Sequence, residues 1–269
     1  MPLSNFPGGV SSFGVPVMGN GFLPPTTGKY FFVDSKTGSN SNDGRSPDSP
    51  LATIDYAIGL CTANKGDVIV VMPGHAETIS AAGGITADVA GISIIGLGVG
   101  SNKPTISFSA TASTFLISAA NVYVANLRVT PTIDEVVKMF HITAAYVTLD
   151  GIEHFETASC QTIQFLLTSA AADYLTVKNC YHYQANAAGS AQKWIELVGC
   201  DNTRILDNTF ILAMNNAATT AVINATTAVV NCEIARNTIL QTGGTTQVSA
   251  ILLVAASTGY VHDNRVAAA

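Results

Sequence analysis

A sequence repeat runs from Gly91 to the C-terminus of this 269-residue chain and limits the folds that it can adopt. Each copy has alternating apolar residues that lead into an Asn or a Gly. These repeat marks are Asn126, Gly151, Asn179, Asn208, Asn237 and Asn264. Successive marks lie 25, 28, 29, 29 and 27 residues apart. A fixed period of roughly 20–50 residues is typical of a solenoid, in which each repeat packs only against its neighbours.

A second apolar segment precedes each of these strand-like segments and ends in small residues. The six copies are residues 114–120, 139–145, 165–171, 194–200, 221–227 and 250–257. Their alternation and their β-branched residues favour short strands over helices. Two or three short strands in each repeat form one coil of a parallel β-helix. Each strand then pairs with its counterpart in the next coil, about 4.8 Å away.

The repeat marks have a physical role in such a coil. Asn tolerates the left-handed backbone at a bend, its amide can bond open backbone groups there, and Gly151 fits the same need. Stacked Asn side chains can also bond one another along the axis as a ladder. In the first three copies the inward residues lie two and four positions before the mark, whereas Ile205 and Ile234 lie three positions before theirs. We therefore expect a bulge or an altered corner between the third and fourth copies.

The segment before the repeats differs in composition. Residues 1–28 contain no charged side chain and are rich in Gly, Pro and Ser. We predict an extended arm that lies on another protein, because free disordered tails are usually charged. A strand folded onto the chain's own solenoid and a disordered tail are the alternatives. The candidate partner-binding residues of the arm are Phe6, Phe13, Val15, Pro16, Val17, Met18, Phe22 and Leu23.

The next segment reads as a cap for the solenoid end, which would otherwise expose core and strand edges. Apolar residues at helical spacing over 51–61 predict a short helix, with Ser49 or Thr53 as its N-cap and Pro50 near its first turn. Strands are expected at 29–34 and 65–74. The predicted organisation is an arm over 1–28, a cap and first coil over 29–90, and β-helix coils over 91–269.

Two motifs in the cap resemble those of a known superfamily. They are VDSKTGSNSNDGRSPDSPLATIDYAIGL (33–60) and KGDVIVVMPGHAETI (65–79). Together they resemble the entry segment of the pectin-lyase-like right-handed parallel β-helix proteins. This resemblance implies a right-handed parallel β-helix. Together with the arm and cap inferred above, the predicted fold is all-β, a right-handed parallel β-helix with an N-terminal arm and a short capping helix. It implies little about function, since the superfamily spans lyases, hydrolases, tailspikes and non-enzymatic virion proteins.

Composition narrows the function classes. Charged residues make up only 11% of the chain and hydrophobic residues 48%, which suggests that other chains cover part of its surface. A net charge of −6 argues against nucleic-acid binding. We expect no membrane span and no secretory signal. The five cysteines are scattered, and we expect free thiols made in a reducing cytoplasm.

Candidate catalytic residues are sparse in this sequence. The densest acidic group is Asp150, Glu153 and Glu156, joined by Lys178 from the next repeat. Hydrolases on this fold need paired carboxyls, and lyases need a carboxylate-rich calcium site. We therefore predict that the chain is not an enzyme and has no catalytic, cofactor-binding or metal residues.

Two histidines occupy the same position in neighbouring repeats. His154 and His182 are each flanked by aromatic residues. Two stacked imidazoles near Glu153, with Cys160 or Cys180 nearby, could bind a metal. A structural pair is the favoured interpretation, and in a trimer the pair could line the symmetry axis.

Taken together, these features favour a structural virion protein. The chain resembles a tailed-phage capsid decoration (cement) protein, which would bind the outer surface of a phage head through its solenoid base and N-terminal arm. The expected partners are the major capsid protein and, in a homotrimer, two further copies. It would be made in the host cytoplasm and located on the capsid surface. The alternatives are a tail fibre or tailspike domain that binds or cleaves host surface polysaccharide, and a cellular polysaccharide lyase or hydrolase.

Overall fold

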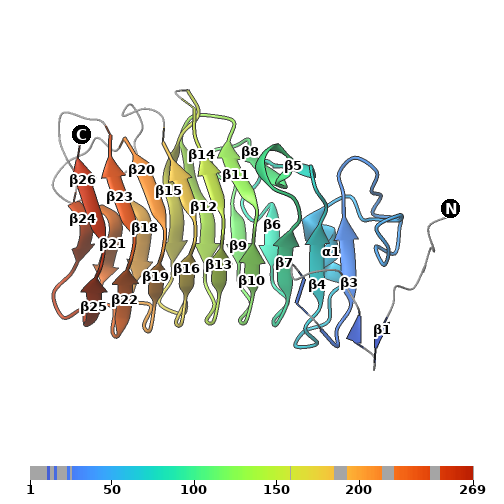
Figure 1. Cartoon of the computed structure of the whole chain (residues 1–269), viewed down its shortest axis with the longest axis horizontal. Helices are drawn as coiled ribbons and strands as arrows, with labels where there is room; N and C mark the ends of the chain where they lie inside the picture. The colour runs from blue at the N-terminus through green and yellow to red at the C-terminus, as the bar shows by residue number, and fades with distance from the viewer. Residues whose placement is uncertain are drawn as a thin grey trace.

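The computed structural model describes residues 11–12, 15–16, 23–24, 26–157, 159–184, 193–213, 221–242 and 249–268. These residues form an elongated parallel β-solenoid with one short α-helix, α1, near its N-terminal end (Figure 1). The predicted all-β solenoid is therefore confirmed. Within the described part of the chain, no helix is long and apolar enough to cross a membrane.

Three parallel sheets make up the walls of the solenoid. The nine-stranded sheet contains β3 (Tyr30–Val33), β4 (Val68–Val71), β7 (Ser93–Gly96), β10 (Tyr123–Ala125), β13 (Thr148–Asp150), β16 (Thr176–Lys178), β19 (Arg204–Leu206), β22 (Cys232–Ala235) and β25 (Gly259–His262). The eight-stranded sheet contains β5 (Ala76–Ile79), β8 (Thr105–Phe108), β11 (Arg128–Pro131), β14 (Glu153–Phe155), β17 (Tyr181–Tyr183), β20 (Thr209–Leu212), β23 (Thr238–Gln241) and β26 (Arg265–Ala268).

The third wall is the seven-stranded sheet, which corresponds to the second apolar segments of the repeats. It contains β6 (Ile85–Ala87), β9 (Phe115–Ile117), β12 (Val136–Ile142), β15 (Thr162–Thr168), β18 (Lys193–Val198), β21 (Ala221–Thr227) and β24 (Ser249–Leu253). Each repeat mark thus divides a sequence segment that looks continuous into two strands of different sheets. A separate antiparallel pair, β1 (Ser11–Ser12) and β2 (Val15–Pro16), precedes the solenoid.

The core is a set of apolar stacks that run along the solenoid axis. In the nine-stranded sheet, Val124, Leu149, Val177, Ile205 and Ile234 pair in register from coil to coil and are fully buried. Alternation along a strand sends one residue inward and the next outward, so each coil adds one layer to the same core.

A short helix closes this core at the N-terminal end. Helix α1 (Ile54–Leu60) begins after Thr53, whose side chain accepts a hydrogen bond from the Tyr56 backbone N–H. Glu77 adds a carboxylate that accepts from the Ile54 N–H at 3.0 Å. Ile54, Ala57 and Ile58 are buried against the first coils, as expected for an amphipathic cap.

The turn between the nine- and eight-stranded sheets needs a left-handed residue in every coil. Asn126, Gly151 and Asn179 take this position with φ of 54°, 63° and 55°. In the next three coils the left-handed residue is instead Asp207, Arg236 or Asp263, with φ of 57°, 56° and 53°.

Of the two expectations for the step between the third and fourth repeats, the altered corner is confirmed and the bulge is wrong. β16 and β19 stay in register, with Val177 opposite Ile205. In the third coil the repeat mark Asn179 is the left-handed residue. In the fourth coil the left-handed residue is Asp207, which precedes the repeat mark Asn208 by one position. A register irregularity does occur elsewhere, between β18 and β21 near Val198.

The six repeat marks accordingly form two structures instead of one ladder. Asn208, Asn237 and Asn264 point inward, and the Nδ2 groups of Asn208 and Asn237 each donate to the Oδ1 of the next Asn at 2.9 Å. Asn126 stays in the turn, where its Nδ2 donates to the Gly96 and Gly98 carbonyls. Asn179 lies at the matching turn and donates to Asp150.

Candidate functional site

Most of the predicted partner-binding arm lies outside the described residues. This holds for Phe6, Phe13, Val17, Met18 and Phe22, and Val15 and Pro16 are described only as the backbone of β2. Leu23 is the residue of this set whose side chain is described, and it is half-buried.

Leu23 packs on the outside of the chain's own solenoid. The outer apolar patch on the nine-stranded sheet consists of buried Phe32, Val68, Val70 and Ile95, with Leu23, Tyr30, Met72, Leu97 and Tyr123 packed around them. Two hydrogen bonds hold the segment that follows Leu23 in place. The Tyr30 hydroxyl donates to the Pro24 carbonyl at 2.8 Å, and the Thr26 hydroxyl donates to the Gly66 carbonyl at 2.6 Å.

The described residues between 23 and 28 therefore differ from the expected arm over another protein. Their position matches the alternative, a segment folded onto its own solenoid. The physical reason is that Phe32, Val68 and Val70 are apolar and face outward. The segment of the same chain that contains Leu23 packs on them and shields them from water.

A second feature is a group of polar side chains on the outside of the seven-stranded sheet. This outer polar cluster consists of Lys138, His141, Gln164, Lys193 and Glu196. The Gln164 amide donates to Glu196 Oε2, and Lys193 Nζ lies 2.8 Å from Glu196 Oε1. Burial first, and the charge of Lys138 second, lower the pKa of His141. Both carboxylate oxygens of Glu196 are thus engaged, and cationic groups lie on either side of the cluster.

The chemistry open to the outer polar cluster is mainly binding. Two lysines, a histidine and an amide can hydrogen-bond hydroxyl or carboxylate groups of a ligand. The cluster contains one carboxylate, whereas hydrolysis of a glycoside uses two carboxyls roughly 5–9.5 Å apart. The sequence shows these residues as outward positions of strands. It does not show that Gln164 and Glu196 meet, because that contact depends on the register of β15 against β18.

The histidine pair lies inside the solenoid. His154 and His182 are opposite each other on β14 and β17, are fully buried, and have ring centroids 6.2 Å apart. Trp194 packs edge-on to His154 at 4.9 Å. The suggestion that the pair lines a trimer axis is therefore wrong, since both rings face the core of one chain.

Burial determines the charge of these groups. It lowers the pKa of His154 to about 3 and, together with the His154 charge, puts the pKa of His182 well below its usual value. Burial raises the pKa of Glu156, which lies 3.6 Å from His154, to about 8. All three groups are neutral at pH 7. Among the described residues, no group of three or more His, Cys, Asp and Glu is placed to hold a metal ion.

The acidic group noted in the sequence is divided among three environments. Asp150 pairs with Lys178 at 3.3 Å outside the nine-stranded sheet. Glu153 lies outside the eight-stranded sheet, where Lys103 and Arg128 bind it at 2.9 and 2.8 Å. Glu156 is buried at the corner that follows β14.

One outer ion pair and the cysteines complete the description of the polar and reactive side chains. Arg204 and Glu233 form an ion pair across neighbouring coils at 2.7 Å. All five cysteines are free thiols.

Comparisons with known proteins establish the fold. No family model matches this sequence. No match is found among the curated proteins. The structure is similar to a solved rhamnogalacturonan lyase, with a TM-score of 0.50 and 16% identity, over 80% of this chain and 70% of that one. A GH136 lacto-N-biosidase from Eubacterium ramulus also matches, with a TM-score of 0.45 and 11% identity, over 83% of this chain and 55% of that one.

The first of these likenesses corrects the expectation that the chain is not an enzyme. That expectation rested on the sparse acidic residues of the sequence, which offered neither paired carboxyls nor a carboxylate-rich calcium site. A solved lyase has the same fold, so the solenoid gives no ground for excluding catalysis. At 16% identity the likeness shows the fold alone and assigns no reaction to this chain.

Proposed function

We propose that this chain attaches to the outer surface of a larger particle, as a capsid decoration protein binds the major capsid protein of a phage head. The observation that carries the proposal is the outer apolar patch. It fixes Leu23 and the residues after it against the solenoid, so the preceding segment leaves from a defined point.

The composition of that preceding segment supports a binding role. Residues 1–22 contain no charged side chain and three phenylalanines, at positions 6, 13 and 22. Apolar burial contributes roughly 25 cal/mol per Å², and the cost of ordering the segment offsets part of it. An anchored arm that buries on the order of a thousand Å² on neighbouring subunits would still resist their separation.

Deletion of residues 1–22 tests the attachment. The truncated chain keeps Leu23 and the patch, so it should remain folded with an unchanged circular dichroism spectrum. It should no longer cosediment with phage heads assembled without the chain. A full-length variant with Phe6→Ser and Phe13→Ser should also lose binding, whereas Ser4→Ala with Ser12→Ala serves as the matched control. Unchanged cosedimentation of the truncated chain would disprove attachment through the arm.

A second candidate function is binding or cleavage of a polysaccharide at the outer polar cluster. The observation that favours it is the fixed Glu196 carboxylate beside Lys193 and Gln164, with His141 two strands away on the same sheet face. Outward side chains at a strand spacing of about 4.8 Å match the size of sugar units. The solved rhamnogalacturonan lyase shows that the same fold can support polysaccharide chemistry.

Polysaccharide assays separate this candidate from particle attachment. The purified chain would be incubated with neutral and acidic polysaccharides, with new reducing ends and unsaturated products as the readouts. Cleavage that Glu196→Gln abolishes and Thr226→Ala leaves unchanged would support the second candidate, since Thr226 lies exposed on β21 of the same sheet. If the chain neither binds nor cleaves any polysaccharide of the panel, the second candidate is wrong.

A further inference from the structure

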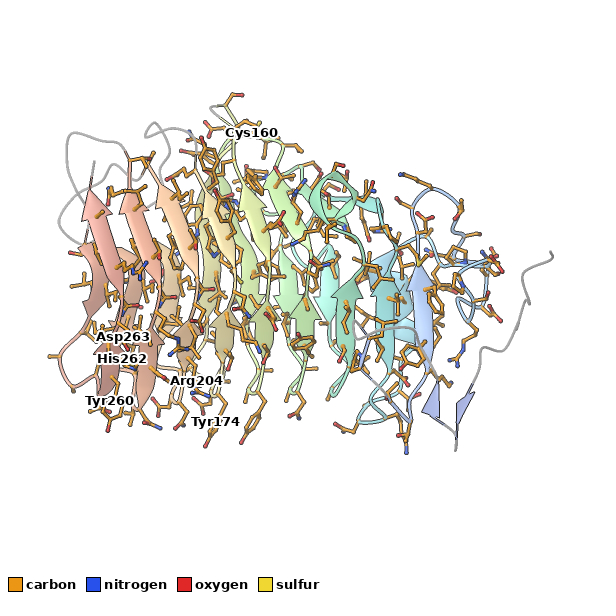
Figure 2. The ribbon with its side chains drawn as sticks, in the orientation of Figure 1. Cys160, Tyr174, Arg204, Tyr260, His262 and Asp263 are labelled. Atoms are coloured by element: carbon orange, nitrogen blue, oxygen red, sulfur yellow. The ribbon has the colours of Figure 1, made fainter. Side chains whose placement is uncertain are left out.

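Two stacked tyrosines stand at an outer corner of the solenoid, where the chain leaves the seven-stranded sheet and enters the nine-stranded sheet. The Tyr146 and Tyr174 rings lie 4.5 Å apart, and their planes differ by only 6°. The two residues are 51% and 46% exposed. Figure 2 shows Tyr174 at the lower edge of the solenoid, where its side chain points away from the sheets. We call this pair the tyrosine corner.

The turn at this corner does not itself require tyrosine. Both tyrosines have a left-handed backbone, with φ of 59° and 58°, which is uncommon for a bulky residue. The preceding coil has Asn121 at the same position and the following coil has Asn202, with φ of 59° and 56°. Asn adopts this backbone more readily than tyrosine does. The two rings are therefore a feature of the surface and not a need of the turn.

One face of the Tyr174 ring is open to a ligand. Neighbouring coils lie about 4.8 Å apart, so two parallel rings of adjacent coils stack along the solenoid axis. Tyr146 covers the face that points to the N-terminal end. The opposite face points to the next coil, whose corner residue is the shorter Asn202. Within the described ranges no other ring or guanidinium contacts Tyr174, so a planar group can stack on this face.

Two aspartates of the same corner lack a cationic partner. Asp173 Oδ1 accepts from the Asp201 N–H, and Asp201 Oδ1 accepts from the Val230 N–H, each at 2.8 Å. Neither carboxylate forms an ion pair with a residue that the structure describes. The neighbouring cations on the nine-stranded sheet already have carboxylate partners, namely Lys178 with Asp150, Arg204 with Glu233 and Arg236 with Asp207. The corner therefore carries uncompensated negative charge.

We propose that the tyrosine corner binds the guanidinium group of an arginine on a partner protein. A guanidinium is a planar cation, so it can stack on the open face of Tyr174 while its edge pairs with Asp173 or Asp201. The uncompensated carboxylates favour this group over a neutral ring. Lysine carries the same charge on a compact ammonium group that lacks a planar face. The site uses no residue of the arm and does not rest on the particle-attachment proposal.

Fluorescence anisotropy with two dye-labelled peptides tests the site on the full-length chain. The probes are Gly-Arg-Gly-Arg-Gly and Gly-Lys-Gly-Lys-Gly, which match in charge and length. The native chain should bind the arginine peptide roughly threefold more tightly, the factor expected of a cation–π contact at an exposed site. Tyr174→Asn should remove this preference and remain folded, because neighbouring coils have Asn in the same turn. Tyr56→Ala, which removes an exposed ring from α1, is the matched control and should keep the preference.

A second variant tests the carboxylates. Asp201→Asn keeps an oxygen for the Val230 N–H and removes the charge, so it should weaken binding of both peptides. Equal affinity of the native chain for the two peptides, binding of neither, or an arginine preference that persists in Tyr174→Asn would overturn the proposal. The chain without residues 1–22 should keep the arginine preference, so a failure of this site and a failure of attachment through the arm are distinguishable.

Discussion

At the scale of single residues, burial of Glu156 couples the stability of the solenoid to pH. Its carboxyl has a pKa of about 8 in the folded chain, against a usual value of 4.5. The folded state holds a proton that the unfolded state loses, so this group makes stability fall as pH rises from about 4.5 to about 8. His154, with its pKa lowered to about 3, has the opposite effect, with stability rising from about pH 3 to 6.5.

Glu156→Gln should therefore change the pH profile in a defined window. Between pH 6.5 and 8 the Glu156 effect acts without the His154 effect, and the native chain should lose about 2 kcal/mol of unfolding free energy there. The variant should lose almost none. Urea unfolding at the two pH values measures this difference. Glu153→Gln is the control, because its ion pairs hold the pKa of Glu153 below its usual range and the loss should persist. A native chain equally stable at both pH values would contradict the assignment.

At the scale of elements, the internal asparagine ladder should stabilise the corner between two sheets. Asn237 donates to Ile205 O and Asn264 Oδ1, and it accepts from the N–H and the amide of Asn208. Asn237→Ala would leave these buried groups unpaired, at a cost of roughly 2–4 kcal/mol. Asn264→Ala, at the end of the ladder, should cost less. Urea unfolding of both variants measures the order, and losses near zero in both would show that the ladder contributes little.

The same corner shows how far sequence predicts this fold. Strands and bends follow from local features, because alternating apolar residues and residues tolerant of left-handed backbone mark them. Asp207 and Asn208 are adjacent, and either could take the left-handed position, so local pattern alone cannot say which one points inward. Hydrogen bonds between coils decide it. The contact of Gln164 with Glu196 depends in the same way on a register between distant segments.

At the scale of the whole molecule, the boundary between arm and solenoid decides what the N-terminal segment can do. The outer apolar patch places that boundary at Leu23, six residues earlier than composition suggests. Deleting residues 1–22 should leave the patch covered, with little change in thermal unfolding. Deleting residues 1–28 should expose Phe32, Val68 and Val70, which are buried in the native chain.

The longer deletion should therefore lower the unfolding free energy by roughly 2–4 kcal/mol. Each large apolar side chain contributes about 1.5–3 kcal/mol when it is fully buried. The loss is smaller than the sum over the patch because the deletion exposes these side chains only in part. It should also bind more of an apolar fluorescent dye than the shorter deletion does. Leu23→Asp in the full-length chain is the sharper variant, because it keeps chain length and disturbs the patch alone. If both deletions unfold at the same temperature and bind equal amounts of dye, the segment after Leu23 is not part of the solenoid. Residues 23–28 would then be free to extend with the arm.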